Sequence, residues 1–315
     1  MTTRYLARRL ALSLLTLVLV SAIVFAVAQV LPGNLARTIL GPYATAGQVA
    51  RLNHELGADR PLPVRYGDWL GGFLRGDWGR SQLLNTPVRP LVLDRLGNSL
   101  VLAAFALVLV VPLSIALGVL AGLTEGRLLD RVVSLTGVAL IAVPEFVAGV
   151  ILLVVFAVKL QWLPVSSHVP GADPVDVVRQ LLLPALPLMF VLFGYIARMA
   201  RAGTVEALAS PYVRTAVLKG LPRRVVVWRH VLRNALLPTV SVVSVQVGYL
   251  VGGLVVIETL FDYPGIGQLV YDSAKGHDVP VLEATVLLVA GVYLVANLVA
   301  DLLYVLLDPR LRTAS

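Results

Sequence analysis

Six long apolar segments run through this chain, and they leave few folds open to it. Leu10–Leu31 contains no charged residue, and about 20 apolar residues are enough for a helix to cross the hydrocarbon core of a bilayer. Five further segments have a similar character: Asn98–Leu123, Val132–Val158, Leu181–Ala200, Ala235–Leu260 and Leu282–Leu307. We therefore predict an all-α integral membrane protein with six transmembrane helices, because a helix satisfies its own backbone hydrogen bonds in lipid.

The composition supports the membrane class and excludes several others. Of the 315 residues, 58% are hydrophobic and 14% are charged, whereas an ordinary globular domain has about 25% charged residues. The chain has no cysteine, so it can form neither a disulfide framework nor a thiolate metal site. The four histidines lie far apart in the sequence and suggest no local metal site: His54, His168, His230 and His277.

No catalytic machinery is recognisable in the sequence. The G-x-x-x-x-G-K-[ST] phosphate loop is missing, so we expect no ATP to bind this chain through such a loop. No nucleophile paired with a base stands out, and no spacing typical of metal ligands. The residues therefore predict no catalytic residue, no metal ligand and no cofactor in this chain, and they argue against an enzyme. The energy for any transport has to come from a partner or from an ion gradient.

Basic residues indicate which side of the membrane each connection occupies. Six spans place both termini on one side, and arginine and lysine cluster at the N-terminus, in the stretch Gly203–Asn234 and after the last span. The only basic residues in the two short connections on the other side are Lys159, Arg179 and Lys275. Because short cytoplasmic connections carry the excess of basic residues, we predict a multi-pass protein with both termini in the cytoplasm. The same rule explains the net charge of +8 without nucleic acid.

The chain divides into three parts. Residues 1–31 form an N-terminal tail and the first transmembrane helix, which we expect to be retained rather than cleaved as a signal peptide. Residues 32–97 form a polar extracytoplasmic segment with helical character. Residues 98–315 form a core of five further transmembrane helices, with a cytoplasmic loop at 203–234.

The extracytoplasmic segment should contain two helices. The first runs from about Thr45, a possible N-cap, to Leu56, with Gly57 as a stop. The second is opened by Pro63 and has one apolar stripe with the spacing i, i+3, i+4, i+7 and i+8. The stripe consists of Tyr66, Trp69, Leu70, Phe73 and Leu74. We expect it to pack on the membrane helices or to lie in the membrane interface, which is compatible with a second role in docking a binding protein.

Small residues and prolines mark further features of the spans. Gly118-x-x-x-Gly122 and Gly248-x-x-x-Gly252 fit close contacts between helices in lipid. Four prolines are expected to kink or begin helices: Pro144, Pro184, Pro187 and Pro238. Such breaks act either as hinges of a transporter or as simple irregularities of packing.

The stretch Gly203–Asn234 is the longest polar interruption in the C-terminal half of the chain. Ser210 and Pro211 are typical of an N-cap and a first-turn residue. Gly220, followed by Pro222, should end that helix after about three turns. A second helix follows immediately, from about residue 223, and leads into the next span. The basic excess of this stretch follows from topology alone, so the short, bounded helix rather than the charge suggests that a partner binds here.

Three motifs in this stretch carry a resemblance to a known family. They are Tyr212-Val213-Arg214-Thr215-Ala216, Lys219-Gly220-Leu221 and Arg229-His230-Val231-Leu232-Arg233-Asn234-Ala235-Leu236-Leu237-Pro238. Together they resemble the coupling loop of ABC-transporter permeases of the dipeptide, oligopeptide and nickel importers. The general importer pattern begins Glu-Ala-Ala, of which only Ala216 matches here, while Gly220 falls at the expected place. The Leu-Pro pair of that pattern is displaced here to Leu237-Pro238, and these departures look like those of the peptide branch.

The resemblance continues over nearly the whole chain. The further motifs are Leu31-Pro32-Gly33, Gly76-Asp77-Trp78-Gly79-x-Ser81, Pro87-Val88, Glu258-Thr259-Leu260-Phe261-x-x-Pro264-Gly265-x-Gly267, Asp278-x-Pro280, Asp301-x-x-Tyr304 and Asp308-Pro309-Arg310. At the first of them the family has Pro-Gly-Asp-Pro, whereas this chain has Asn34 and Leu35 in the last two places. Each motif is weak alone, but their order and spacing across six spans are specific.

The resemblance implies a fold, a mechanism and a set of partners. The fold is the six-helix type I permease of ABC importers in the cytoplasmic (inner) membrane of a prokaryote, and the chain looks like the first permease of a heterodimeric pair. The implied partners are a second related permease chain, two ATPase subunits that bind ATP and Mg²⁺, and an extracytoplasmic substrate-binding protein. In the implied alternating-access mechanism, ATPase motion is transmitted by Tyr212, Val213, Arg214, Thr215, Ala216, Lys219, Gly220 and Leu221.

Five polar side chains in or near the spans are candidates for the substrate pathway or for structural contacts: Glu145, Gln246, Glu258, Asn297 and Asp301. Glu145, in the middle of the third span, either meets a cation or the amino group of a substrate, or it pairs with a donor on a neighbouring helix. Glu258 is expected to anchor a loop, and Asp301 to form an interfacial ion pair. Gln246 and Asn297 are expected to form interhelical hydrogen bonds.

Two other functions fit part of the sequence. A gradient-driven secondary carrier or channel would explain the hydrophobicity and Glu145, but not the bounded helix or the terminal motifs, and no internal duplication is evident. A membrane-embedded enzyme lacks a recognisable nucleophile, base or metal cluster. The substrate stays open, because relatives of this kind carry dipeptides, longer peptides, modified peptides and nickel chelates, and their selectivity rests largely with the binding protein.

Overall fold

The protein is built of α-helices, as predicted. The computed structural model describes residues 2–30, 40–41, 43–55, 59–164 and 173–307. Within these ranges there is no β-strand, and the nearest approach to one is an isolated antiparallel bridge between Arg80 and Pro87. The all-α prediction is therefore confirmed.

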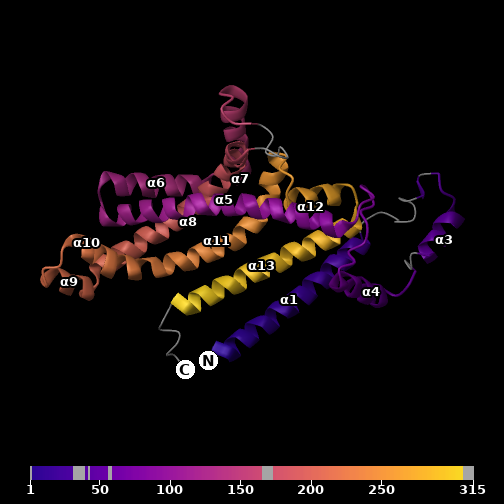
Figure 1. The fold of residues 1–315 in the computed structure, drawn as a ribbon, viewed down its shortest axis with the longest axis horizontal. Coiled ribbons are helices and arrows are strands. Elements are labelled where there is room, and N and C mark those ends of the chain that lie inside the picture. Colours follow the sequence, from indigo (N-terminus) through magenta and orange to yellow (C-terminus); the bar gives the residue numbers. More distant parts are fainter. Residues whose placement is uncertain (1, 31–39, 42, 56–58, 165–172, 308–315) are drawn as a thin grey trace. The chain divides into compact units, whose positions relative to one another are not determined.

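The helices follow the predicted order along the chain (Figure 1). The long ones are α1 (Thr2–Val30), α5 (Val88–Leu123), α8 (Pro174–Ala209), α11 (Leu232–Leu260) and α13 (Val279–Leu307). Each contributes a stretch long and apolar enough to cross a membrane. The shorter ones are α3 (Ala46–Glu55), α4 (Leu62–Arg75), α6 (Leu128–Ala142), α7 (Glu145–Leu152), α9 (Pro211–Leu218), α10 (Arg223–Val225) and α12 (Ile266–Lys275). Two π-helical segments, η1 (Leu153–Lys159) and η2 (Val226–Val231), continue α7 and α10.

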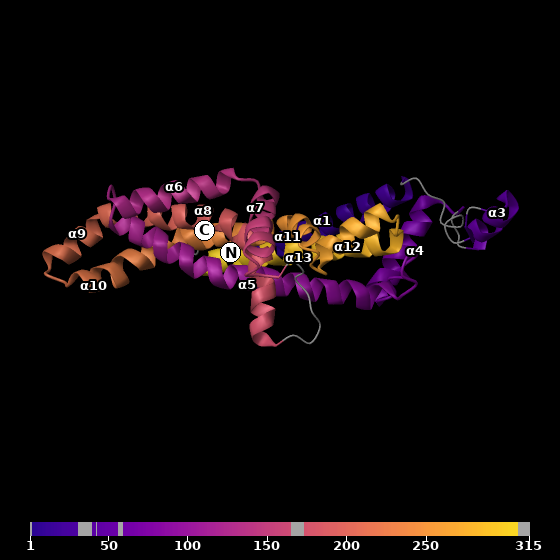
Figure 2. The same ribbon diagram turned by 90° about the horizontal axis from the view of Figure 1, so that it is seen from above.

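The third predicted span is two helices rather than one. α6 and the α7–η1 segment each extend from a break at residues 143–144, where they meet at 100° (Figures 1 and 2). Val143 and Pro144 have extended backbone, with ψ of 122° and 136°. Proline has no N–H to donate, and it disfavours helical geometry in the residue before it. The prediction of one continuous helix over Val132–Val158 is therefore wrong: five helices of the described residues are long and apolar enough to cross a membrane, and the bent pair is either a sixth, broken span or a re-entrant segment. Pro184 and Pro187, by contrast, remain inside α8.

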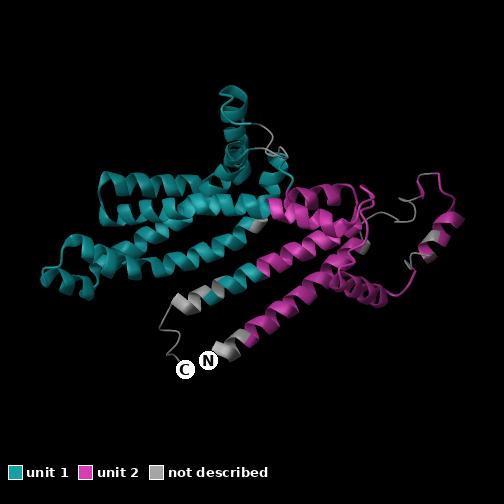
Figure 3. Cartoon of the chain, in the orientation of Figure 1, with its two compact units in different colours: residues 1–5, 99–264, 295–315 teal, residues 6–98, 265–294 magenta. Residues whose placement is uncertain are grey.

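Contacts divide the chain into two compact units (Figure 3). Unit 1 comprises residues 1–5, 99–264 and 295–315. Unit 2 comprises residues 6–98 and 265–294. The division falls inside α1, α5 and α13, so these three helices contribute residues to each unit.

The core of unit 1 is organised around α8. Buried residues make up 72% of the most apolar stretch of α8, compared with 22% of that of α5. α8 contacts α6, α7 and α11, and its fully buried side chains include Leu183, Leu188, Leu192 and Ile196. A helix that is apolar on all sides is expected at the centre of such a bundle.

Two glycines let α5 approach α8 closely. A Cβ atom on Gly118 would lie 2.4 Å from the carbonyl oxygen of Ala197, and one on Gly122 would lie 2.7 Å from Cβ of Thr204. The close contact predicted at Gly118-x-x-x-Gly122 is therefore confirmed. In the second motif Gly248 is buried, while the packing of Gly252 lies outside the described residues.

Replacement of Gly118 by alanine should destabilise the protein by about 1–3 kcal/mol, because the added methyl group would force a backbone carbonyl away. Thermal unfolding of the protein in mild detergent measures the effect. Gly97→Ala is the matched control on the same helix, since no heavy atom lies within 4 Å of the added Cβ. Equal unfolding temperatures for the two variants would contradict the close packing of α5 on α8.

In unit 2 the apolar stripe of α4 packs on α1, as predicted. The Phe25 ring of α1 lies 5.6 Å from both the Tyr66 and the Trp69 ring, measured between centroids. The Tyr66 hydroxyl is hydrogen-bonded to the Ser21 hydroxyl at 2.7 Å. Leu74 is the exception in the stripe, because 76% of it is exposed.

The first helix between the first two predicted spans, α3, begins with a reciprocal cap. The Thr45 backbone N–H and hydroxyl both donate to Oε1 of Gln48, and the Gln48 N–H points back to the Thr45 hydroxyl at 3.4 Å. This arrangement is a capping box, which satisfies two N–H groups at the start of a helix. The N-cap prediction at Thr45 is confirmed, while the predicted end at Leu56 and Gly57 lies outside the described residues.

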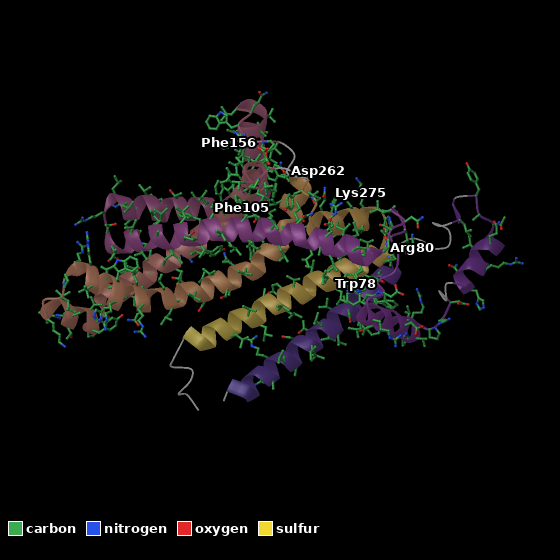
Figure 4. The ribbon with its side chains drawn as sticks, viewed as in Figure 1. Trp78, Arg80, Phe105, Phe156, Asp262 and Lys275 are labelled. Atoms are coloured by element: carbon green, nitrogen blue, oxygen red, sulfur yellow. The ribbon has the colours of Figure 1, made fainter. Side chains whose placement is uncertain are left out.

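A turn at residues 79–88 is tied to the connection between α12 and α13 within unit 2. The Ser81 hydroxyl donates to Oδ2 of Asp278 at 2.5 Å, and the Leu83 N–H donates to the same oxygen at 3.2 Å. Asp278 is only 2% exposed. Just before the turn lies Trp78 (Figure 4). Its ring stacks on that of Phe73, with centroids 4.6 Å apart.

Ser81→Ala should lower the stability of unit 2 by about 1.5–3 kcal/mol, the typical worth of a hydrogen bond to a charged group. The substitution leaves the buried Asp278 carboxylate with one donor fewer. Limited proteolysis of the segment that contains this turn reports the lower stability as faster cleavage. Leu84→Ala, in the same turn at a residue that is 57% exposed, is the control, and equal cleavage of the two variants would argue against the Ser81–Asp278 tie.

Candidate coupling surface and intramembrane polar site

α9 is the short helix predicted in the stretch Gly203–Asn234. Ser210 precedes it, but its hydroxyl donates back to the Ala207 carbonyl oxygen and does not cap the new helix. α9 has 8 residues, or about two turns at 3.6 residues per turn rather than the predicted three. It ends before Gly220, whose φ of +75° is a left-handed conformation that glycine adopts without steric cost.

One face of α9 is buried inside the protein. Val213 and Ala216 are each 4% exposed. They form a small apolar cluster with residues that precede and follow the helix: Ala207, Val226, Val231 and Ala235. α9 thereby contacts the end of α8 and the π-helical segment η2 (Figure 1).

Several apolar side chains of α9 and of the residues just after it are exposed. The exposed fractions are 42% for Tyr212, 57% for Val217 and 79% for Leu218, and Leu221, just beyond the helix, is 38% exposed. We refer to these four residues as the outer face of α9. An exposed apolar patch bordered by polar residues is typical of a protein interaction site.

The predicted coupling residues fall into two groups in the structure. Arg214, Thr215 and Lys219 are exposed, and with Tyr212, Gly220 and Leu221 they lie where a partner can reach them. Val213 and Ala216 point inward and can act only by holding α9 in place. Val217 and Leu218 were not predicted as coupling residues. Leu218 lies five residues after Val213 and so falls off the buried face, whereas Val217 has the i, i+4 spacing from Val213, and only the fold shows that it is exposed.

The second helix begins at Arg223, as predicted, and continues through η2 into α11. Within η2 the backbone hydrogen bonds span five residues instead of four, a rare arrangement that often marks functional sites. Trp228, in this segment, is 75% exposed. The connection between α9 and α11 is thus helical throughout but locally widened.

A buried ion pair lies in the helices that lead to this stretch. Arg201 of α8 donates through Nε to Oδ1 of Asp130 and through Nη2 to Oδ2 at 2.8 Å. Asp130, which is 4% exposed, also accepts from the Gly126 N–H at 2.9 Å and from the Ser134 hydroxyl at 3.3 Å. A two-bond arginine–carboxylate pair is directional as well as strong. It fixes the start of α6 to α8 two residues before Gly203, where the coupling stretch begins.

Glu258 is placed to anchor the loop after α11. It is fully buried, and its Oε1 accepts from the Ser99 hydroxyl of α5 at 2.5 Å. Its carbonyl oxygen accepts from the Tyr263 N–H at 2.9 Å. Burial, and then the charge of Glu258, raise the pKa of the Tyr263 phenol well above its usual range, so Tyr263 stays neutral. Asp262, labelled in Figure 4, lies between them in the chain. Its φ is +48°.

The other polar candidates are less well defined. Gln246 is 7% exposed, and its amide nitrogen has no hydrogen-bond partner among the described residues, so that atom does not make the expected interhelical bond. Asn297 is half-buried on α13. The side chain of Asp301 lies outside the described residues, so its expected ion pair stays a prediction.

Glu145 is the first residue of α7, directly after the break in the third span. Its carboxylate lies against α11 at Gly253, where a Cβ atom would be 3.0 Å from both carboxylate oxygens. Oε1 is buried and has no hydrogen-bond partner among the described residues. The structure thus places this candidate between the helix break and α11, in close contact with Gly253, a neighbour that the sequence did not predict.

Comparison with known proteins identifies the family. Residues 114–313 match the model of the "Binding-protein-dependent transport system inner membrane component", and residues 2–103 match the N-terminal model of the same kind of protein. The chain belongs to this family. It is an inner-membrane permease, and membership of this family displaces the secondary-carrier and enzyme alternatives.

Full-length relatives place the permease among ABC importers, as the motifs predicted. A probable peptide ABC transporter permease of Sinorhizobium fredii is 36% identical over 311 residues, which cover 98% of this chain and 99% of that protein. A glutathione transport system permease of Salmonella choleraesuis is 36% identical over 308 residues, 98% of each chain. A putative peptide transport system permease of Brucella melitensis is 34% identical over 313 residues, 99% of each.

Proposed function

We propose that this permease is one half of the translocation path of an ATP-driven importer of peptides. The observation that carries the proposal is the geometry of α9, a short helix that is fixed to its own protein on one side and leaves the apolar side chains of its outer face exposed. The names of the relatives, which refer to peptide and glutathione transport, support the substrate class.

The proposed partner at the outer face of α9 is an ATPase subunit. Closure of two such subunits on ATP and Mg²⁺, which they bind, moves α9 and with it the ends of α8 and α11. Because α8 is packed against α6, α7 and α11, this movement reorients the spans between outward-open and inward-open states. The importer is completed by a second related permease chain and an extracytoplasmic binding protein, with both termini of this chain in the cytoplasm.

Affinity purification in mild detergent from the native host, followed by mass spectrometry, tests the proposal. We expect a second permease and two ATPase subunits with phosphate-binding loops to co-purify. A stable complex without any nucleotide-binding protein, together with uptake that an ionophore abolishes, would contradict it.

A further inference from the structure

The break in the third predicted span interrupts a stretch that is apolar enough to enter a membrane. Val143 and Pro144 are extended between α6 and α7, and Pro144 is exposed on the isolated chain. Within a membrane, non-helical backbone is tolerated only where protein covers it or where it lines a water-filled cavity. In transporters, interrupted helices of this kind mark substrate sites.

Glu145 begins directly at this break, and its charge is not neutralised by the described part of the chain. No lysine, arginine or histidine forms an ion pair with it there, and Oε1 is buried without a hydrogen-bond donor. A carboxylate in the hydrocarbon region is costly unless it is paired or faces a polar cavity. A cationic group from outside this chain would meet that need.

The surroundings of Glu145 suit an ammonium group rather than a metal ion. No cluster of three or more acidic, histidine or cysteine residues that could hold a metal is found in the described residues. An ammonium group has three N–H donors, and a carboxylate accepts from such a donor in a charge-assisted hydrogen bond without further ligands around it.

Gly253 leaves room for the Glu145 carboxylate against α11. Any side chain on this residue of α11 would come within 3.0 Å of both Glu145 oxygens. α7 is held here by Gly149, where a Cβ would lie 2.6 Å from the Leu260 side chain. The position of the carboxylate is therefore set by close packing of α7 on α11.

We propose that Glu145, at the helix break and against Gly253, forms a cation subsite in the translocation path that receives an ammonium group of the transported peptide. This inference rests on the proposed function. The ammonium group is supplied either by the free amino terminus of the peptide or by a lysine side chain, and both have the same chemistry at the subsite.

Uptake from a defined peptide pool tests the subsite. The probe is a mixture of di- to pentapeptides with and without lysine, together with N-acetylated versions of the same sequences, supplied to host cells and followed by mass spectrometry. A strain that lacks the permease defines which peptides it carries. If no peptide depends on the permease, the proposed function fails, and the subsite fails with it.

Glu145→Gln should slow uptake of the dependent peptides by about tenfold or more, since it removes a charge-assisted hydrogen bond. Gly253→Ala, which keeps the charge but displaces the carboxylate, should slow it by a smaller factor. Glu125→Gln is the control, because Glu125 is an acid that is largely exposed at another turn. A loss restricted to peptides with a free amino terminus assigns the α-ammonium group, and a loss restricted to lysine peptides assigns the side chain.

Three results would overturn the subsite while leaving the proposed function intact. The first is uptake by Glu145→Gln at the wild-type rate. The second is equal slowing of N-acetylated peptides that contain no lysine. The third is loss of the second permease from the purified Glu145→Gln complex, which would show that Glu145 pairs with a basic residue of that partner instead.

Discussion

Leu218→Asp should abolish peptide uptake while the permease remains folded in the membrane. Leu218 is 79% exposed on the outer face of α9, so the substitution removes no contact within this chain. It places a charge in an apolar surface where an ATPase subunit is proposed to dock. Replacement of a central anchor residue typically costs about 2–4 kcal/mol of binding, which is roughly 30-fold or more in affinity. Recovery of ATPase subunits with the purified permease measures the loss.

The matched control is an equally exposed leucine in a different segment of the chain. Leu74, on α4, is 76% exposed and belongs to the segment predicted on the opposite side of the membrane. Leu74→Asp should leave ATPase recovery unchanged. If Leu218→Asp recovers as much ATPase as the wild type, the outer face of α9 is not the docking surface.

Arg201→Met should destabilise the permease by about 3–5 kcal/mol, the typical cost of removing one partner of a buried ion pair. Methionine retains the length of the side chain but leaves Asp130, 4% exposed, without its two strongest donors. The melting temperature of the purified protein reports the effect. A lower yield in the membrane should accompany it.

The double variant Asp130→Asn with Arg201→Met separates the loss of the pair from the cost of an unpaired charge. It should recover much of the stability lost in Arg201→Met, because no buried charge is left alone. Glu125→Gln should have little effect, since Glu125 approaches Arg201 only to 4.0 Å and is 58% exposed. A double variant as unstable as Arg201→Met alone would contradict the pairing.

The membrane helices could be predicted because their signal is local. Long apolar runs with few charges have no other stable arrangement in lipid, and the structure places helices over all six runs. The helix cap at Thr45 and the helix stop at Gly220 could also be predicted, because each depends on residues within one turn. The apolar stripe on α4 could be predicted from its spacing, but its partner Phe25 on α1 could not.

The contacts that link distant parts of the sequence could not be predicted. Ser81 and Asp278 are 197 residues apart, and Asp130 and Arg201 are 71 apart. Neither pair has a local pattern that indicates the other partner. The 100° bend at Val143 and Pro144 was missed for a related reason. A proline is compatible with a kink, a break or a continuous helix, as Pro184 inside α8 shows, and the surrounding packing decides among them.

The candidate site was predicted in part. Motif resemblance identified the region of α9 but not which residues face outward, since Val213 and Ala216 are buried and Val217 and Leu218 are exposed. Glu145 stood out in the sequence because acidic residues are rare in spans. Its neighbour Gly253 on α11 follows only from the fold.

Cysteine cross-linking at position 218 tests the central claim most directly. The natural chain has no cysteine, so Leu218→Cys carries a single thiol. In native membranes, a bifunctional reagent that attaches to this thiol cross-links it to the nearest reactive group of a neighbouring protein. The account predicts a covalent product that contains an ATPase subunit with a phosphate-binding loop, and no such product from Leu74→Cys. A partner of any other class captured at position 218, with the ATPase captured elsewhere or not at all, would contradict the account.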